Sequence, residues 1–386
     1  MSRKALAIKL AQAAALLAGI FWLISQARPP QLLVTLGEQQ AVRTANPIAG
    51  VHTRFVDEVE EWKIKRGLEM AREMGAGWVV EFFPWAYYEG RQGARDFSGA
   101  DRIVDHANRQ GLKVIARLGF VPAWARPKTL PDGRPTTFTH LDPEHYADFA
   151  AFAAAFAAHF RGRITQIVIW NEPNLSGEWG LRPVDPAAYA RMLQVVYPAI
   201  KQANPDAQVL AGALAPTLET DRNGALNDLV YLEEMYAALE DGRPKTADGL
   251  PSYVSRPFDG ISMHSYGRNA PPDEAPAPDR INFRRTELLR EVMLKHGDTS
   301  PVFITEAGWN DDPRWAFGVS PAQRIAYTLG AWDYARDHWD YARCVAMWVY
   351  KLPAPENSYR DHFQFITPGL EPLPIYEEAK RHLVDR

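Results

Sequence analysis

Residues 167–174 read IVIWNEPN, a short apolar run that ends in asparagine, glutamate and proline. Residues 302–309 read VFITEAGW, a second apolar run that ends in threonine and glutamate. A short apolar run that stops at a polar turn is typical of a strand buried on both faces of a parallel sheet. The two stretches therefore predict buried strands that carry Glu172 and Glu306 at their carboxyl ends.

The same apolar pattern occurs eight times between residue 46 and the C-terminus, separated by stretches with helical periodicity. Several of these stretches begin with a helix start such as Asp185-Pro186 or Ser320-Pro321. No GxGxxG follows any apolar run, which disfavours a doubly wound nucleotide-binding sheet. Eight βα units predict an α/β protein, a (β/α)8 TIM barrel. The expected strands are 48–53, 77–83, 113–118, 166–170, 208–213, 260–264, 302–305 and 345–350.

Long connections follow four of the expected strands, at residues 122–140, 217–227, 268–280 and 352–374. All four leave the carboxyl ends of strands, so they are expected to surround one face of the barrel. Barrel enzymes hold their active sites on that face. A rim of long loops favours a cleft for a polymer over a small pocket. The proline-rich residues 270–276 are consistent with a domain linker, but two more strands follow them, which favours a loop within the barrel.

Composition excludes several classes of function. The 43 lysines and arginines nearly balance the 47 acidic residues, and no basic stripe predicts a nucleic-acid partner. The single cysteine, Cys344, excludes an internal disulfide and a cysteine-based zinc site, and it is expected to be a small buried residue. The ten histidines form no HExxH motif, so neither a metal nor another cofactor is predicted.

The N-terminus has the pattern of an export signal. Arg3, Lys4 and Lys9 precede an uncharged stretch, residues 10–27. Residues 1–30 predict a signal peptide or a signal anchor, with a soluble amphipathic helix as the alternative. Residues 31–45 are expected to be a tether, and residues 46–386 the catalytic domain. The domain is therefore predicted outside the cytoplasm, secreted, periplasmic or tethered, with membrane contact only through the N-terminal segment.

The combination of Asn171-Glu172-Pro173 and Thr305-Glu306 resembles clan A of the glycoside hydrolases, the retaining enzymes of the Asn-Glu-Pro type. This resemblance implies that Glu172 is the acid/base, that Glu306 is the nucleophile, and that Asn171 bonds the substrate 2-hydroxyl. The segments around Trp85 to Glu89 and Asp96 to Val114 are similar to families 39 and 5, including membrane-tethered members linked to exopolysaccharide production. Some clan relatives carry a basic residue late in strand two, where this chain has Glu81 and Phe82.

The resemblance also implies substrate contacts. His264-Ser265-Tyr266 resembles the clan's aromatic partner of the nucleophile, so Tyr266 is expected to donate a hydrogen bond to Glu306. Trp348 resembles the tryptophan that forms the floor of the subsite of the cleaved sugar. Packing in the core is the alternative for His264, Tyr266 and Trp348, as a turn role is for Asn171.

Other residues fall near the expected rim. Trp85, Trp124 and Trp309 are predicted to bind substrate, since sugar rings stack on flat aromatic faces, and Trp179 and Trp315 are further candidates. His52 and Arg117 are expected to point to the same face, with a structural salt bridge as the alternative for Arg117. Glu178 lies in a loop, where no strand fixes it, and ranks below Glu172 as the acid.

Electrostatics predict a division of labour between the two glutamates. Carboxyl groups about 5.5 Å apart, as in retaining enzymes, interact by about 3 kcal/mol at an effective dielectric near 20. We therefore expect the acid to be protonated while the nucleophile is ionised. The predicted function is a monomeric, cofactor-free retaining O-glycosidase that hydrolyses β-linked polysaccharide or oligosaccharide by double displacement. The alternatives are a transglycosylase that uses the same glutamates, or a non-catalytic carbohydrate-binding barrel in a membrane polysaccharide assembly system.

Overall fold

The computed structural model describes residues 4–5, 9, 12–19, 34–241 and 256–384. The chain divides into two compact units, Met1–Thr35 and Leu36–Arg386. In the first unit residues 12–19 are helical and exposed. No helix within the described ranges is long and apolar enough to cross a membrane. Most of the predicted signal or anchor segment, with its candidate cleavage residues Ser25 and Ala27, lies outside the described residues.

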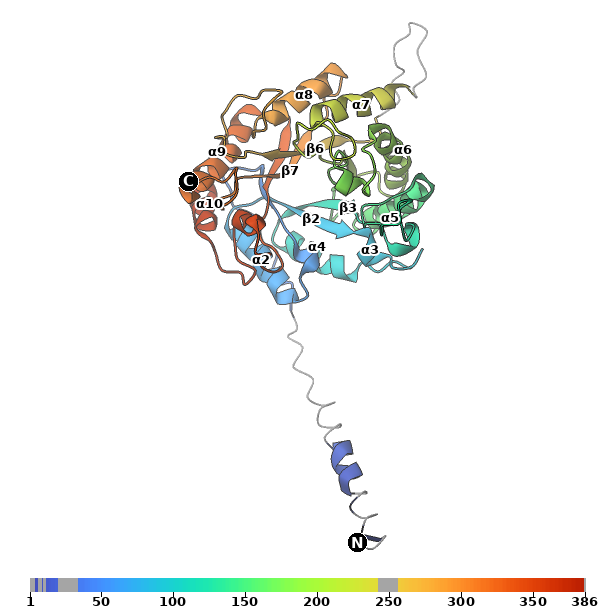
Figure 1. Cartoon of the computed structure of the whole chain (residues 1–386). Helices are drawn as coiled ribbons and strands as arrows, with labels where there is room; N and C mark the ends of the chain where they lie inside the picture. The colour runs from blue at the N-terminus through green and yellow to red at the C-terminus, as the bar shows by residue number, and fades with distance from the viewer. Residues whose placement is uncertain (1–3, 6–8, 10–11, 20–33, 242–255, 385–386) are drawn as a thin grey trace. The chain divides into compact units, whose positions relative to one another are not determined.

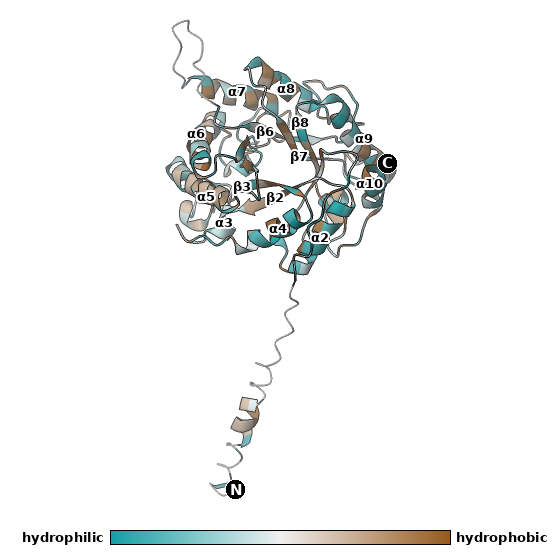
Figure 2. Cartoon of the chain, turned by 180° about the vertical axis from the view of Figure 1, so that it is seen from behind, coloured by the Kyte–Doolittle hydropathy of each residue, from teal (hydrophilic) through white to brown (hydrophobic). Residues whose placement is uncertain are grey.

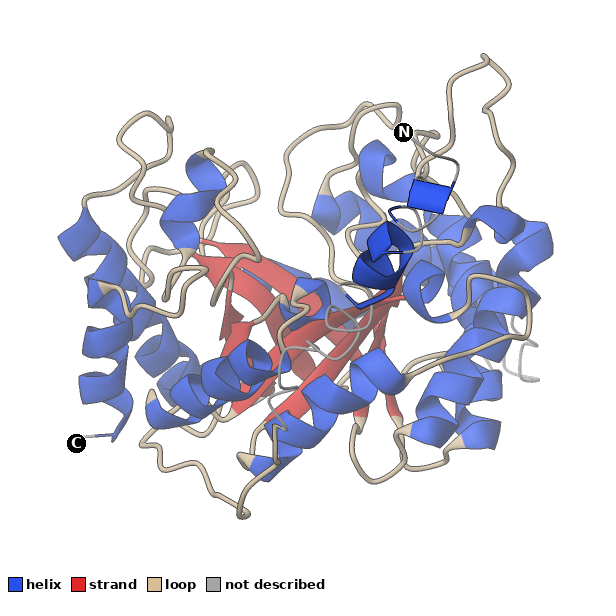
Figure 3. Ribbon diagram, turned by 90° about the horizontal axis from the view of Figure 1, so that it is seen from below, coloured by secondary structure: helices blue, strands red, loops and turns tan. Residues whose placement is uncertain are grey.

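The second unit contains a closed barrel of eight parallel strands in sequence order, and the first strand pairs with the last. Figure 1 shows the strands at the centre of the helical ring, and Figure 3 shows the same layers from below. The predicted (β/α)8 barrel is therefore confirmed for the described part of the chain. The strands are β1 (Ala49–His52), β2 (Trp78–Pro84), β3 (Lys113–Gly119), β4 (Gln166–Ile169), β5 (Gln208–Ala211), β6 (Gly260–Tyr266), β7 (Val302–Gly308) and β8 (Ala342–Met347).

Helices cover the outside of this barrel, and many turn polar, teal faces toward solvent (Figure 2). Asp185 caps α6 (Pro186–Ala203) and Ser320 forms a capping box at α9 (Pro321–His338), at two of the predicted helix starts. Short 3-10 turns, among them η1 (Phe55–Asp57), η4 (Ser176–Trp179) and η5 (Tyr359–Phe363), lie in loops that follow strands. The α-helices are α2 (Glu61–Glu73), α3 (Trp85–Tyr88), α4 (Ser98–Arg109), α5 (Tyr146–His159), α6 (Pro186–Ala203), α7 (Asp228–Asp241), α8 (Arg285–Lys295), α9 (Pro321–His338) and α10 (Pro374–Val384).

A small apolar cluster fills the amino-terminal end of the barrel interior. Ile115 and Val168 belong to it, and so does Cys344, buried as expected. Side chains two residues apart on a strand share a face, so the next inward position on β3 after Ile115 is Arg117. The barrel interior thus changes from apolar to charged along the strands, and the charged layer lies at the carboxyl end.

The position of β8 differs from the sequence-based expectation in a way that bears on the site. β8 begins at Ala342 and ends at Met347, earlier than the expected 345–350, so Trp348 lies just after the strand. The strand starts early because the backbone N–H of Val302 is already bonded to Tyr341, beside the first rung of β8. Part of the predicted tether also packs on the barrel unit: the N–H groups of Gln40 and Ala45 donate to the carbonyl oxygens of Arg109 and Leu383. The compact unit therefore starts before residue 46.

Candidate active site

Irregular backbone at the ends of two strands presents the two glutamates. Glu172 follows β4 with a φ of 38°, in the left-handed region, and its N–H donates to the Ala213 carbonyl at 2.9 Å. Such a conformation costs a non-glycine residue about 1 kcal/mol. Glu306 lies in β7, where the pairing with β8 shifts register between Ile304 and Ala307. Both departures from regular structure occur at the residues that the sequence singles out, as is common at functional sites.

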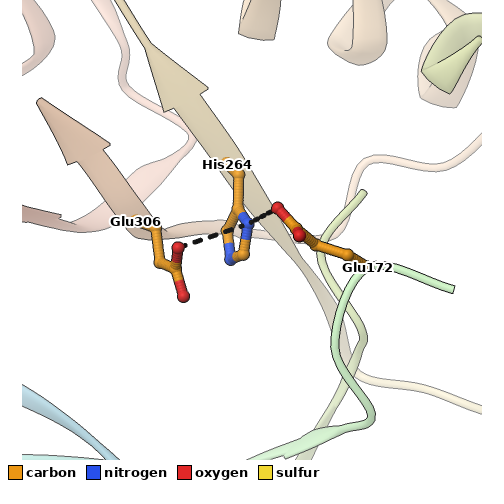
Figure 4. Close-up of side chains that lie close together, drawn as sticks. All are labelled: Glu172, His264 and Glu306. Carbon is orange, nitrogen blue, oxygen red and sulfur yellow. Dashed lines mark hydrogen bonds and ion pairs between the residues drawn. The ribbon is translucent and has the colours of Figure 1, made fainter. Parts of the chain in front are cut away.

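The two carboxyl groups approach each other on either side of one histidine (Figure 4). His264 Nδ1 lies 2.8 Å from Glu172 Oε1 and 3.8 Å from Glu306 Oε2. One oxygen of each glutamate and one nitrogen of the histidine all lie within 4.8 Å of one another. The carboxyl ends of β4, β6 and β7 therefore bring these three groups into a single cluster.

Glu306 is the most heavily bonded member of the cluster. Tyr266 donates its hydroxyl to Oε2 at 2.7 Å, and Arg117 donates to Oε1 at 2.7 Å. The same guanidinium nitrogen of Arg117 also donates to Asn171 Oδ1 at 2.7 Å. Arg117 therefore holds the carboxylate and fixes which side of the Asn171 amide is available. The amide nitrogen is left for other partners, and Asn171 hydrogen-bonds Glu178.

The surroundings set the charges in the cluster. Burial raises the pKa of Glu306, but the charges of His264 and Arg117 more than offset this, and its pKa lies well below the usual range. Burial lowers the pKa of His264, yet the neighbouring Glu306 and Glu172 outweigh it, and the net shift is upward. Burial and the charge of Arg117 lower the pKa of His52 to about 3, so this histidine is neutral. Glu306 is therefore a carboxylate, and His264 is a favourable place for a proton.

A cavity of about 490 Å³ opens over the cluster. Its wall includes both glutamates, Asn171, Tyr266 and Trp348. A cavity of this size fits the range of small-molecule sites, and its polar groups converge at the base. The cluster is thus reachable by a ligand.

Solved structures similar to this chain include a family 39 glycoside hydrolase from Bacteroides cellulosilyticus, at 21% identity and a TM-score of 0.64, over 87% of this chain and 63% of that one. A family 39 enzyme from Xanthomonas axonopodis matches at 16% identity and a TM-score of 0.57, over 91% of this chain and 71% of that one. The family 5 subfamily 18 protein of Streptomyces cattleya, solved with GlcNAc, matches at 14% identity and a TM-score of 0.60, over 89% and 80%. The fold of this chain is the (β/α)8 barrel that these glycoside hydrolases share.

At these identities the similarity to clan A structures shows the fold alone. This chain spans less than two thirds of the length of the Bacteroides protein. No family model matches the sequence, and no curated protein matches it either.

Within this fold, the residues predicted from sequence separate into two groups. Glu172, Glu306, Asn171, Tyr266 and Trp348 line the cavity, and His264 joins the two glutamates beneath it. The cavity wall also contains Trp315 and Arg117.

The other predicted tryptophans are placed outside the cavity wall. Trp85 is fully buried against Phe149 and Phe152, and Trp309 is fully buried against Phe283. Their indole N–H groups are bonded to Glu89 and to the Ala270 carbonyl. No ring face is left for a sugar, so the predicted stacking role does not fit Trp85 or Trp309.

Trp124 and Trp179 also pack against protein. Trp124 is half-buried, lies edge-on to Trp85 at 5.3 Å and donates to the Glu89 carbonyl. Trp179 is buried edge-on to Trp170. These rings support the rim loops from behind and do not line the cavity.

Glu178, which the sequence ranks below Glu172 as the acid, is also part of the site. It lies on η4 and lines the cavity. Burial, and then the charge of Glu172, raise the pKa of Glu178 to about 7. The signal in the sequence was the position of Glu178, only six residues after Glu172. Its contacts depend on the folded loop: the side chain bonds Asn171, and its carbonyl accepts from the Trp170 indole N–H.

Glu172, His264 and Glu306 are close enough to hold a metal ion. However, Glu306 already accepts bonds from Arg117 and Tyr266, and the arginine places a positive charge beside the cluster, which disfavours a bound cation. The donor set is therefore better matched to proton transfer between a histidine and two carboxyl groups than to a divalent ion.

Proposed function

We propose that this chain is a retaining glycoside hydrolase that cleaves β-glycosidic bonds of a polysaccharide or oligosaccharide. The observation that carries the proposal is the approach of the Glu172 and Glu306 oxygens to within 4.8 Å at the base of an open cavity. Retaining enzymes hold their carboxyl groups about 5–5.5 Å apart, whereas inverting enzymes leave about 6.5–9.5 Å for a water molecule. The spacing therefore favours direct attack by a carboxylate.

In the first step the Glu306 carboxylate attacks the anomeric carbon and forms a glycosyl ester, while the bond to the leaving oxygen breaks. The leaving oxygen takes a proton from Glu172, which shares that proton with His264 Nδ1 across 2.8 Å. Arg117 and Tyr266 keep Glu306 ionised and oriented for this attack. Asn171, fixed by Arg117, is positioned to bond the substrate 2-hydroxyl.

In the second step water attacks the same carbon and breaks the ester. Glu172 accepts the proton of that water, and the Glu306 carboxylate is restored. Formation of the ester removes the negative charge of Glu306, which had favoured protonation of its neighbours. His264 lies between the two glutamates and can exchange a proton with Glu172. Two carboxyl groups without the histidine would have no such third group.

Substrate size and location are part of the same proposal. Trp348 and Trp315 offer aromatic surface in the cavity wall, and several rim loops extend the site, which fits a polymer. On the sequence of residues 1–30 alone, we place the enzyme outside the cytoplasm, secreted, periplasmic or tethered, and we expect it to act as a monomer.

The test is turnover of a panel of β-linked polysaccharides by wild type, Glu172→Gln and Glu306→Gln. Glu377→Gln, on an exposed position of α10, is the matched control. We expect Glu306→Gln to lose activity by on the order of 10⁴-fold, because the nucleophile is removed. Near wild-type turnover by Glu306→Gln would overturn the proposal. Analysis of products with and without added acceptor sugar separates hydrolysis from transglycosylation.

A further inference from the structure

Basic side chains lie on one side of the cavity mouth, across from Glu178. Glu178 lies in the loop after β4, whereas Arg268 follows β6 and Arg360 lies in the loop after β8. In a closed barrel of eight strands, β4 and β8 are on opposite sides. The loops after β6, β7 and β8 therefore form a basic wall, which we define by Arg268, Trp315, Tyr359 and Arg360.

Arg268 is held in place at the cavity, although it lacks an acidic partner. Its backbone has a φ of 51°, and its guanidinium lies 4.2 Å from the centre of the Phe317 ring. Burial and the nearby Arg285 charge lower its pKa, as expected of a cation without a counter-charge. Across residues 34–241 and 256–384, no carboxylate lies within ion-pair distance of Arg268.

The other arginines of the cavity wall are already engaged. Arg117 is bonded to Glu306 at 2.7 Å, and Arg54 is bonded to Asp57 at 2.6 Å. Arg360 has a loose, exposed contact with Glu356 at 3.6 Å and a hydrogen bond with Tyr359. Arg268 is thus the half-buried positive charge of the wall that remains open to a ligand.

Aromatic rings extend from Arg268 to the loop that carries Arg360. Phe317 packs edge-on against Trp315 at 5.5 Å, and Trp315 stacks on Tyr359 at 5.3 Å with an interplanar angle of 16°. Trp315 and Tyr359 both line the cavity. Aromatic faces bind the apolar faces of sugar rings, and guanidinium groups bind planar anions through paired N–H groups. The basic wall offers both chemistries together.

We propose that the substrate is an anionic glycan, whose sugars carry carboxylate or sulfate groups, and that Arg268 pairs with one of these groups. The inference rests on the proposed function in one respect, since it assigns the substrate class of the same site. A neutral polysaccharide would leave Arg268 half-buried and uncompensated in the complex, which costs binding free energy.

The experiment measures binding of the full chain by affinity electrophoresis in matched pairs of polymers. Poly-β-mannuronate is compared with the same polymer after its carboxylates are reduced to alcohols, and cellulose sulfate is compared with hydroxyethyl cellulose. We expect Kd for at least one anionic polymer to be about tenfold lower than for its neutral partner, the size of one charge-assisted hydrogen bond. The pair that shows the difference identifies the anion as carboxylate or sulfate.

Variants assign the preference to the basic wall. Arg268→Gln should reduce the anionic preference about tenfold, and Arg268→Lys should retain part of it. Arg343→Gln is the control, because Arg343 lies on β8 near its amino-terminal end, away from the cavity. Thermal unfolding checks that each variant is folded. If the wild type binds each neutral polymer as tightly as its anionic partner, the inference is overturned. It is also overturned if Arg268→Gln keeps the full preference for the anionic polymer.

Failure of the anionic-substrate inference can be distinguished from failure of the proposed hydrolase function, because the experiment measures binding, and binding does not require cleavage. A preference that depends on Arg268, without cleavage of any polymer, would overturn hydrolysis and support the anionic substrate. Cleavage that is lost in Glu306→Gln but is equally fast on the anionic and neutral members of both pairs would support hydrolysis and overturn the anionic substrate.

Discussion

The two ends of the barrel interior are built on the same strands but do different work. At one end Ile115 packs against Val168 and Cys344. Two residues further along β3, Arg117 bonds Glu306 and Asn171. Because inward positions repeat every second residue, one strand supplies both layers. On β3, the residue that packs in the apolar layer and the residue that holds the catalytic groups are therefore only two positions apart. Substitutions at these two positions should affect stability and activity separately.

The largest effect is expected from Arg117→Met. Loss of the guanidinium removes the bonds that hold Glu306 and Asn171, and kcat/KM should fall by about 10²–10³-fold, as for other lost charge-stabilising donors. The positive charge also lowers the pKa of Glu306, so its removal should move the acidic limb of the pH profile to higher pH. Arg117→Lys keeps the charge and should shift this limb less. A pH profile that is the same in Arg117→Met and wild type would contradict the role.

A smaller effect is expected from Glu178→Gln, on stability. The pKa of Glu178, about 7, exceeds that of an unfolded glutamate, so its contribution to stability is present at low pH and is lost as the pH rises through 7. Glutamine stays neutral. The free energy of unfolding of the variant, relative to that of wild type, should therefore rise by about 1–2 kcal/mol when the pH is raised from 5 to 8. This figure allows for solvent in the cavity.

Urea denaturation at the two pH values measures this gain. The control is Glu377→Gln, on the exposed face of α10, which should show no pH-dependent difference of this kind. If Glu178→Gln differs from wild type by the same amount at both pH values, Glu178 is not the group that titrates.

The smallest effect is expected from Ile115→Val, in the apolar layer. Removal of one buried methylene should lower the free energy of unfolding by about 0.5–1.5 kcal/mol. The side chain lies one inward step below Arg117, so kcat/KM should stay close to that of wild type. Thermal or chemical denaturation and steady-state rates give the two values. A tenfold loss of activity would show that the two layers are not separable.

Much of this comparison could be predicted from the sequence, because it depends on local pattern. The ends of two apolar runs located Glu172 and Glu306, and the family resemblance located Tyr266. Helix-start signals at Asp185 and Ser320 located α6 and α9. Strand positions are fixed by the barrel itself, so a residue at a strand end is placed once the strand is recognised.

What the sequence did not reveal depends on contacts between distant segments. Trp85 and Trp309 were predicted to bind sugar, but their rings are buried against α5 and against Phe283. Glu178 and Arg268 become part of the cavity only because loops fold over it. Periodicity describes which face a residue occupies on its own element and says nothing about which element covers that face.

The central claim is that Glu306 attacks the sugar directly across the short gap to Glu172. Proton NMR of the first sugar released from a β-linked polymer tests it, because the anomeric proton reports the configuration before mutarotation. The account predicts that the β-anomer appears first. Initial release of the α-anomer would show inversion and would contradict the account, since water would then have to attack where the carboxyl oxygens lie within 4.8 Å.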